Sequence, residues 1–283
     1  MSRIAILTDS SAYLPSDLVE RYGINVISLK VHWGEETFVD GVDITPAEFY
    51  ARLATNSALP TTSQPSSHDF LQVFDELASR YEGIVVPLIS SGISGTVASA
   101  QAAAAEFTKV PVNIVDTHST TAGLALVVLA AARAVEQGRS LPEVTQIARE
   151  VAQKLHLLFA VDTLKYLHKG GRIGGASRYL GTALDIKPIL FFNEEGKIDA
   201  LERVRTKRKA LDRLITLAEE KSKGNPIHVG VLHANAPEVA AALQARVSEY
   251  LKCKEIFTCE LSPVIGTHVG PGTIGIAFYT EKA

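Results

Sequence analysis

The first half of the sequence repeats one pattern, in which a short aliphatic run leads through a loop into a segment with helical periodicity. Residues 4–7, 83–89 and 112–115 are aliphatic runs of this kind, and residues 24–29 are expected to add a further strand. Strands that alternate with helices form βαβ units, whose strands lie parallel in one sheet. The pattern therefore predicts a parallel-sheet, three-layer α/β domain over residues 1–160.

Several predicted strands end in loops that are rich in hydroxyl side chains, namely Thr8–Ser11, Ser90–Thr96 and Asp116–Thr120. Ligands of parallel sheets bind at the carboxyl ends of the strands, which meet at one edge. We therefore expect these loops to form one polar edge. A further hydroxyl-rich segment, Thr61–Ser67, is predicted to be a surface loop because of its composition and its prolines.

The second half of the sequence mixes strands with charged helices. Residues 157–161, 186–192 and 198–204 are predicted strands, and residues 194–197 are predicted to form the hairpin turn between the last two. Together with the later strand and helix segments, they predict an α+β domain over residues 161–283. We place the domain boundary near residue 160, to within about ten residues.

Composition limits the class of protein. A chain of 283 residues suits two domains, and a net charge of −3 gives no overall basic footprint for nucleic acid. The basic run at residues 203–209 would suit phosphate or an acidic partner, or is a solvated helix start. Two cysteines, Cys253 and Cys259, are too few for a disulfide framework. The most apolar run, residues 122–132, is shorter than the roughly 20 residues that cross a bilayer. We therefore expect a cytoplasmic protein with no targeting segment.

The Ser90–Thr96 loop has two interpretations. A loop of Gly and Ser that enters a helix offers backbone N–H groups to an anion, and the Ser94 hydroxyl would add a donor. Ser and Thr also cap helices without binding any ligand. From this segment alone, capping is the simpler explanation. The same holds for Thr61–Ser67, which is most simply a surface turn before a helix.

Two other segments present polar groups on glycine-rich backbone. Residues 266–273 contain three glycines and a proline, and they are predicted to form a rigid loop that offers His268 to a carboxylate or phosphate. The alternative is a tight turn with an exposed histidine. Arg172 lies in the basic turn at residues 169–175 and would bind carboxylate or phosphate in a bidentate manner. A solvated basic loop is the ordinary alternative.

Enzyme motifs are absent or incomplete. The sequence has no P-loop, no GxGxxG after a strand and no HExxH, and its eight histidines show no metal-ligand spacing. Gly92–Thr96 does not match the GxSxG elbow, because Thr96 takes the place of the final glycine. We therefore predict no catalytic residue and no metal site. A serine-dependent acyl hydrolase or transferase that uses Ser94 and His268 is the alternative, although no orienting acid is evident.

Taken together, these segments resemble the DegV family, which is known for fatty-acid binding. The resemblance spans essentially the whole chain and involves separated motifs in the same order. These motifs are Thr8-Asp9-Ser10, Thr61-Thr62-Ser63-Gln64-Pro65-Ser66, Ser94-Gly95-Thr96, Val115-Asp116-Thr117, Gly170-Gly171-Arg172-Ile173, Arg205-Thr206 and Thr267-His268-Val269-Gly270-Pro271-Gly272.

The resemblance implies a FakB-type subunit of bacterial fatty acid kinase, a non-catalytic lipid-binding protein of phospholipid metabolism. Such a subunit binds a long-chain fatty acid such as palmitate, stearate or oleate, and it needs no other cofactor. It presents the carboxylate to a separate kinase, which makes the acyl phosphate from ATP, and its role allows transient contact with a membrane. The implied fold is a parallel-sheet domain followed by an α+β domain that closes the lipid site.

The resemblance also assigns roles to residues. It places the carboxylate on two hydroxyl-rich segments and one histidine, which together are Thr62, Ser63, Ser94, Gly95, Thr96 and His268. It places Arg172 and Arg205 near the mouth of the site, for phosphate contact or kinase docking. Neutral donors leave a buried carboxylate without a full counter-charge, so that it can be partly protonated. Residues 122–132 and 189–192 are either walls of the tail site or ordinary core.

Overall fold

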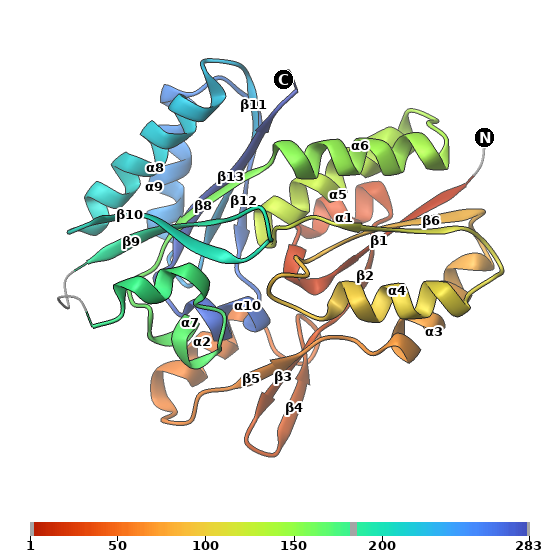
Figure 1. The fold of residues 1–283 in the computed structure, drawn as a ribbon, viewed down its shortest axis with the longest axis horizontal. Helices are drawn as coiled ribbons and strands as arrows, with labels where there is room; N and C mark the ends of the chain where they lie inside the picture. Colours follow the sequence, from red (N-terminus) through yellow and green to blue (C-terminus); the bar gives the residue numbers. More distant parts are fainter. Residues whose placement is uncertain (1–2, 182–185, 282–283) are drawn as a thin grey trace.

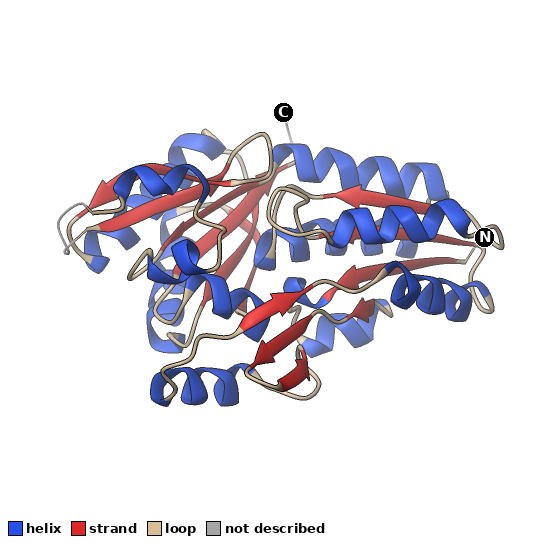
Figure 2. Cartoon of the chain, turned by 60° about the horizontal axis from the view of Figure 1, so that its bottom comes forward, coloured by secondary structure: helices blue, strands red, loops and turns tan. Residues whose placement is uncertain are grey.

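The computed structural model describes residues 3–181 and 186–281, which form three sheets with helices packed around them. A four-stranded parallel sheet and a six-stranded mixed sheet lie side by side, and a three-stranded sheet lies below them (Figure 1). The small sheet is again at the bottom in the second view, which separates the helices from the strands by colour (Figure 2). The predicted fold class is therefore confirmed.

The parallel sheet has the strand order β2-β1-β6-β7 and helices on both faces. Alternate residues of β1 face opposite sides, so that Leu7 packs with α3 and α4 while Ile6 packs toward α5 and α6. Both faces are covered, which explains why β1 and β6 read as continuous apolar runs. The elements are β1 (Ile4–Asp9), η1 (Ser10–Ala12), α1 (Ser16–Tyr22), β2 (Asn25–Ile27), α3 (Ser67–Ala78), β6 (Gly83–Leu88), α4 (Thr96–Glu106), β7 (Val112–Asp116), α5 (Thr121–Glu136) and α6 (Leu141–Lys154).

Helix α5 is apolar on nearly every side because it lies between the two large sheets. It contacts β1 and β6 of the parallel sheet and β11 and β13 of the mixed sheet. A helix enclosed in this way needs no polar face. No helix in the described part of the chain is long and apolar enough to cross a membrane.

The mixed sheet has the strand order β10-β9-β8-β13-β11-β12, and among its described strands only β11 and β12 pair in parallel. Helices α8 and α9 pack on one face of it. Its elements are β8 (His156–Ala160), α7 (Lys165–Lys169), η2 (Gly174–Tyr179), β9 (Lys187–Phe192), β10 (Ile198–Val204), α8 (Lys207–Ser222), β11 (Ile227–His233), α9 (Pro237–Tyr250), β12 (Cys253–Glu260), α10 (Pro263–Val269) and β13 (Ile274–Thr280). Because β8 pairs in this sheet, we place the domain boundary just before His156, a few residues earlier than the sequence suggested.

The three-stranded sheet was not anticipated from the sequence. It consists of β3 (Lys30–Trp33), β4 (Glu36–Val39) and β5 (Thr61–Ser63), in the order β4-β3-β5, with α2 (Pro46–Thr55) beside it. The strand predicted at residues 24–29 is confirmed but is shorter than expected, since β2 ends at Ile27 and the next strand joins another sheet. The loop predicted at Thr61–Ser67 is confirmed only for residues 64–66, because its first part is β5 and its last residue begins α3. Backbone pairing with β3 outweighs the loop-like composition.

Candidate functional site

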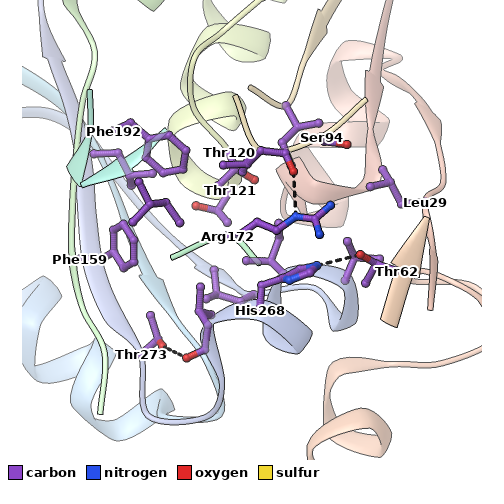
Figure 3. A pocket seen from close by; sticks show the side chains of 18 of the residues that line it. Leu29, Thr62, Ser94, Thr120, Thr121, Phe159, Arg172, Phe192, His268 and Thr273 are labelled. Carbon is purple, nitrogen blue, oxygen red and sulfur yellow. Dashed lines mark hydrogen bonds between the residues drawn. The ribbon is translucent and has the colours of Figure 1, made fainter. Parts of the chain in front are cut away.

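A cavity lies where the three sheets meet, and its empty volume, which includes space open to solvent, is about 700 Å³. The wall is mainly apolar, and it is formed by residues of the three-stranded and mixed sheets, of α10, and of the loops that follow the strands of the parallel sheet (Figure 3). Its apolar residues are Leu29, Ile89, Ile93, Leu157, Phe159, Phe192, Ile198, Leu232, Leu261, Val264, Ile265 and Val269.

Four polar side chains, Thr62, Ser94, Arg172 and His268, gather on one side of this cavity, whereas Thr120, Thr121 and Thr273 lie nearer to the phenylalanines. In Figure 3, Thr62 and Ser94 lie on the side opposite Phe159 and Phe192, and Arg172 lies between Ser94 and His268. The cavity thus has a polar end and an apolar end. We use these two terms below for the walls around Thr62, Ser94, Arg172 and His268 and around Leu157, Phe159 and Phe192, respectively.

Thr62 belongs to the polar end because of its place in β5. Successive strand residues point to opposite faces. The Thr62 hydroxyl lies 2.8 Å from Nε2 of His268, whereas the Ser63 hydroxyl lies 2.8 Å from Nε2 of His32 on the other face. Ser63 lines the cavity, but its hydroxyl is engaged elsewhere. Of the two, only Thr62 turns its hydroxyl toward α10.

His268 stands on a helix rather than on the loop that the sequence predicted. Ser262 caps α10 by accepting a hydrogen bond from the backbone N–H of Ile265 at 3.4 Å, and Pro263 follows as the first helical residue. The loop prediction is therefore wrong, since the glycines at positions 270 and 272 follow the helix and do not carry the histidine. Gly170 packs on the imidazole so closely that a Cβ there would lie 2.3 Å from Nδ1.

Buried Asp40 anchors the start of α10. Its carboxylate accepts hydrogen bonds from the Ser10 hydroxyl at 2.6 Å and from the backbone N–H of Val264 at 3.2 Å. Burial raises the pKa of Asp40 to about 6. These contacts join η1, the segment after β4 and α10, so they fix the helix that carries His268.

The imidazole of His268 is neutral near neutral pH. Burial, together with the nearby charge of Arg172, lowers its pKa to about 4. Nδ1 is buried and has no hydrogen-bond partner among the described residues. An orphaned acceptor is less costly than an orphaned N–H, so the ring is best satisfied with its proton on Nε2. Nε2–H then donates to Thr62, and the Thr62 hydroxyl keeps its own proton for an anion in the cavity.

Arg172 brings a positive charge to the same end. Its Nε donates to the carbonyl of Ile93 at 3.2 Å, and its Nη1 donates to the carbonyl of Gly170 at 2.8 Å. No carboxylate in the described part of the chain forms an ion pair with it. A guanidinium has five N–H donors, so several remain for a ligand. The polar end is therefore not made of neutral donors alone, which revises the expectation of a carboxylate without a full counter-charge.

Ser94 lies just before α4, in a loop held by the mixed sheet. Its hydroxyl accepts from the backbone N–H of Thr96 at 3.3 Å and lies 2.8 Å from the Thr96 hydroxyl. The preceding Ser90 donates to the carbonyl of Gly196 at 2.6 Å, in the β9–β10 turn. A Cβ at Gly92 would lie 2.4 Å from that carbonyl oxygen, so a glycine is required there. Ser94 thus supports its helix and also lines the cavity.

The other predicted site residues are distributed as follows. Gly95 and Arg172 line a surface pocket beside the polar end, which also includes Ser94, Gly171 and Lys197. Thr96 is fully buried and is not among the described residues that line the cavity. Arg205 is exposed after β10, outside the lining of the cavity.

The sequence did not identify Thr120 and Thr121 as site residues, although the loop that ends at Thr120 stood out for its hydroxyls. Both line the cavity at the start of α5, and both hydroxyls are buried without a partner in the described chain. Thr121 has a φ of 51°, which is rare for a β-branched residue. No sequence pattern signals that conformation.

Of the two alternatives for residues 122–132 and 189–192, ordinary core is confirmed for nearly all of them. Residues 122–132 of α5 belong to the core, and none of them lines the cavity. Of residues 189–192, only Phe192 faces it, while Phe191 packs with α8 and α9 on the other face of the sheet. Sequence periodicity shows which residues are buried, but a cavity wall and a packed core bury the same kinds of side chain.

The Ser94 hydroxyl and the His268 imidazole are not hydrogen-bonded to each other. Nε2 of His268 is bonded to Thr62, and the Ser94 hydroxyl is bonded to Thr96. Nδ1 of His268, where an orienting carboxylate would bind, has no partner within the described residues. In the same part of the chain, no group of three or more His, Cys, Asp or Glu side chains is arranged to hold a metal ion.

Known proteins resemble the chain over its full length. A family model described as "Uncharacterised protein, DegV family" matches residues 3–281. A DegV domain-containing protein of Halalkalibacterium halodurans is 37% identical over 284 residues, which cover 100% of both chains.

Solved structures agree in fold. One structure concerns fatty acid binding of a DegV family protein from Thermus thermophilus, which is 36% identical with a TM-score of 0.93, over 98% of this chain and 99% of the other. DegV of Bacillus subtilis, a fatty acid binding protein, is 33% identical with a TM-score of 0.91, over 99% of this chain and 100% of the other.

Proposed function

Because the chain belongs to the DegV family, we propose that it binds one long-chain fatty acid, with the tail in the cavity and the carboxylate at the polar end. The observation that carries the proposal is the division of the cavity between a mainly apolar wall and one end that holds Thr62, Ser94 and Arg172. A fatty acid has the same division. The fatty acid binding of the structural relatives from Thermus thermophilus and Bacillus subtilis supports the proposal.

We assign three groups to the carboxylate. Arg172 supplies the positive charge and free N–H donors, and the hydroxyls of Thr62 and Ser94 supply neutral donors. His268 acts mainly on Thr62, because its Nε2–H directs the Thr62 proton away from the ring. Charge-assisted hydrogen bonds are roughly twice as strong as neutral ones, so Arg172 is expected to contribute most.

The tail supplies most of the gross affinity. Each buried methylene contributes about 0.8 kcal/mol, so a tail of about fifteen methylenes contributes roughly 12 kcal/mol before immobilisation costs of several kcal/mol. Micromolar or tighter binding is therefore expected without a strong ion pair. The carboxylate contacts then fix the orientation of the ligand rather than dominate its affinity.

We further propose that the protein presents the carboxylate to a separate kinase and does not itself catalyse phosphoryl transfer. The surface pocket beside the polar end supports this, since it adjoins the proposed carboxylate position and carries Arg172 and Lys197. A carboxylate oxygen would attack the γ-phosphorus of ATP brought by the kinase, with ADP as the leaving group. Exposed Arg205 remains a candidate for kinase docking.

Calorimetric titration of the delipidated protein tests the binding proposal. We expect palmitate or oleate to bind at one site per chain. Hexadecanol, which has the same tail but no charge, should bind more weakly. Absence of binding by both acids would contradict the proposal.

Reconstitution with a purified bacterial fatty acid kinase and ATP tests presentation separately. Acyl phosphate should form only when kinase, loaded protein and ATP are all present. Arg205→Glu should reduce that rate without changing palmitate binding. Equal acyl phosphate formation with and without the protein would contradict a presenting role.

A further inference from the structure

Two side chains separate the apolar end of the cavity from a second pocket at the surface. Leu157 of β8 and Phe192 of β9 line both spaces, and they are the only residues in the described chain that do so. The outer pocket has an empty volume of about 1120 Å³, which includes space open to solvent. It extends around the ends of β8 and β9, since Leu158 and Phe191, on the opposite face, also line it. Leu157 and Phe192 therefore lie between the inner cavity and the outer pocket.

The backbone that carries Phe192 is fixed. Phe192 ends β9 and pairs with Ile198 across the hairpin. The turn is closed by hydrogen bonds from the N–H of Asn193 to the carbonyl of Lys197 and from the N–H of Gly196 to the carbonyl of Asn193, both at 2.9 Å. The Ser90 hydroxyl pins the same turn to the parallel-sheet domain. A change at this position must therefore come from the side chain rather than from the strand.

The Phe192 ring closes the inner cavity on its apolar side. It lies with its centroid 6.4 Å from that of Phe159, and the two rings lie on the side of the cavity away from Thr62 (Figure 3). A carboxylate held at the polar end would direct the methyl end of its tail toward these rings. The distance between the two ends then limits the length of tail that stays inside.

The outer pocket differs in character from the inner cavity. Its rim carries the polar side chains of His118, Gln153, Asn193 and Lys221, but Leu155 and Leu201 give it apolar wall as well. A tail that extended past Leu157 and Phe192 would contact further apolar surface there, although that pocket is partly open to solvent. With Phe192 in place, that surface is not available to the tail.

We propose that Phe192, together with Leu157, sets the upper limit of acyl length that this protein accepts. The inference depends on the proposed fatty acid binding and specifies its substrate class. Removal of the Phe192 ring joins the two spaces and lets longer tails extend into the outer pocket. Each methylene newly buried should then tighten binding by up to roughly fourfold.

The test compares Phe192→Ala with Phe191→Ala, its neighbour in β9. Each delipidated protein is incubated with an equimolar mixture of myristate, palmitate, stearate, arachidate and behenate, and the bound acids are identified by native mass spectrometry. We expect wild type to reject the longest acids and Phe192→Ala to accept them, with an enrichment of at least about tenfold. Phe191→Ala enlarges only the outer pocket, so it should keep the wild-type distribution.

The outcomes separate this inference from the proposed function. If Phe192→Ala binds palmitate but selects the same lengths as wild type, or if Phe191→Ala shifts the distribution equally, the inference is wrong. If wild type binds none of the five acids, fatty acid binding itself is wrong. Phe192→Leu keeps the test valid should the alanine variant fold poorly. It should shift the distribution in the same direction by a smaller amount, and an unchanged distribution would again contradict the inference.

Discussion

The polar and apolar ends of the cavity are built in different ways. At the polar end, a few side chains from distant parts of the chain have definite partners, such as Thr62 with His268 and Arg172 with two backbone carbonyls. At the apolar end, side chains such as Phe159 and Phe192 line a space by shape alone. The polar end should therefore determine which head group binds and at what pH the site is intact, whereas the apolar end should determine tail length.

The largest expected effect concerns His268 and pH. Its pKa is about 4 in the folded protein and near 6.5 when unfolded, so the unfolded chain takes up the proton first as pH falls. Protonation of His268 should therefore have no effect on the free energy of unfolding above about pH 7. Between pH 6.5 and 4 it should lower that free energy by up to about 3 kcal/mol. Urea unfolding at several pH values should show that His268→Gln removes this loss.

His156, whose pKa burial also lowers to about 4, is present in both proteins and serves as the internal control. It should cancel when the two stability curves are subtracted. Parallel curves for wild type and His268→Gln throughout this pH range would show that the ring is not held neutral.

The next effect concerns the charge at the polar end. Arg172→Met should weaken palmitate binding by about ten- to a hundredfold, since a hydrogen bond to a charged group contributes about 1.5–3 kcal/mol. Hexadecanol, titrated in the same calorimeter, should lose much less affinity. Equal losses for acid and alcohol would mean that Arg172 supports the wall through Ile93 and Gly170 rather than binding the carboxylate.

A smaller difference is expected between two neighbours in β5. Thr62→Val removes a hydroxyl that faces the cavity and should weaken palmitate binding by roughly fivefold, which corresponds to about 1 kcal/mol. Ser63→Ala removes a hydroxyl bonded to His32 and should leave the palmitate affinity nearly unchanged. A larger loss of palmitate affinity in Ser63→Ala than in Thr62→Val would contradict this assignment, because the carboxylate would then lie on the face of β5 that carries Ser63.

The smallest single step is the loss of one methylene from the ligand. Affinity should fall by roughly fourfold for each methylene removed between palmitate and laurate, or about 0.8 kcal/mol per step. The same slope should appear in Arg172→Met, because the two ends act independently over this separation. A slope that changes in the variant would show that the head group and the tail are coupled.

The sequence predicted the polar end better than the apolar end for a physical reason. Hydroxyl and basic residues in glycine-rich segments are unusual enough to be noticed, and Thr62, Ser94, Arg172 and His268 do line one cavity. Their backbone setting was missed, since β5 depends on pairing with β3 and α10 is fixed by Asp40. Both are long-range contacts that local composition does not encode.

No comparable sequence pattern marked the residues of the apolar end. The run at residues 122–132 is the most apolar in the chain, but it is core because two sheets enclose α5. Phe192 differs from Phe191 only in the face of the strand on which it lies, and that face is decided by the register of β9 with β10. The alternation of parallel strands and helices, by contrast, was predictable from local periodicity, because burial on both faces imposes it.

Native mass spectrometry of the purified protein tests the central claim most directly. The two-ended cavity predicts one long-chain fatty acid per chain, lost on denaturation and recovered in an organic extract. After delipidation, addition of palmitate or oleate should restore a single adduct. A protein that is empty as purified and gains no adduct with either acid would contradict the account.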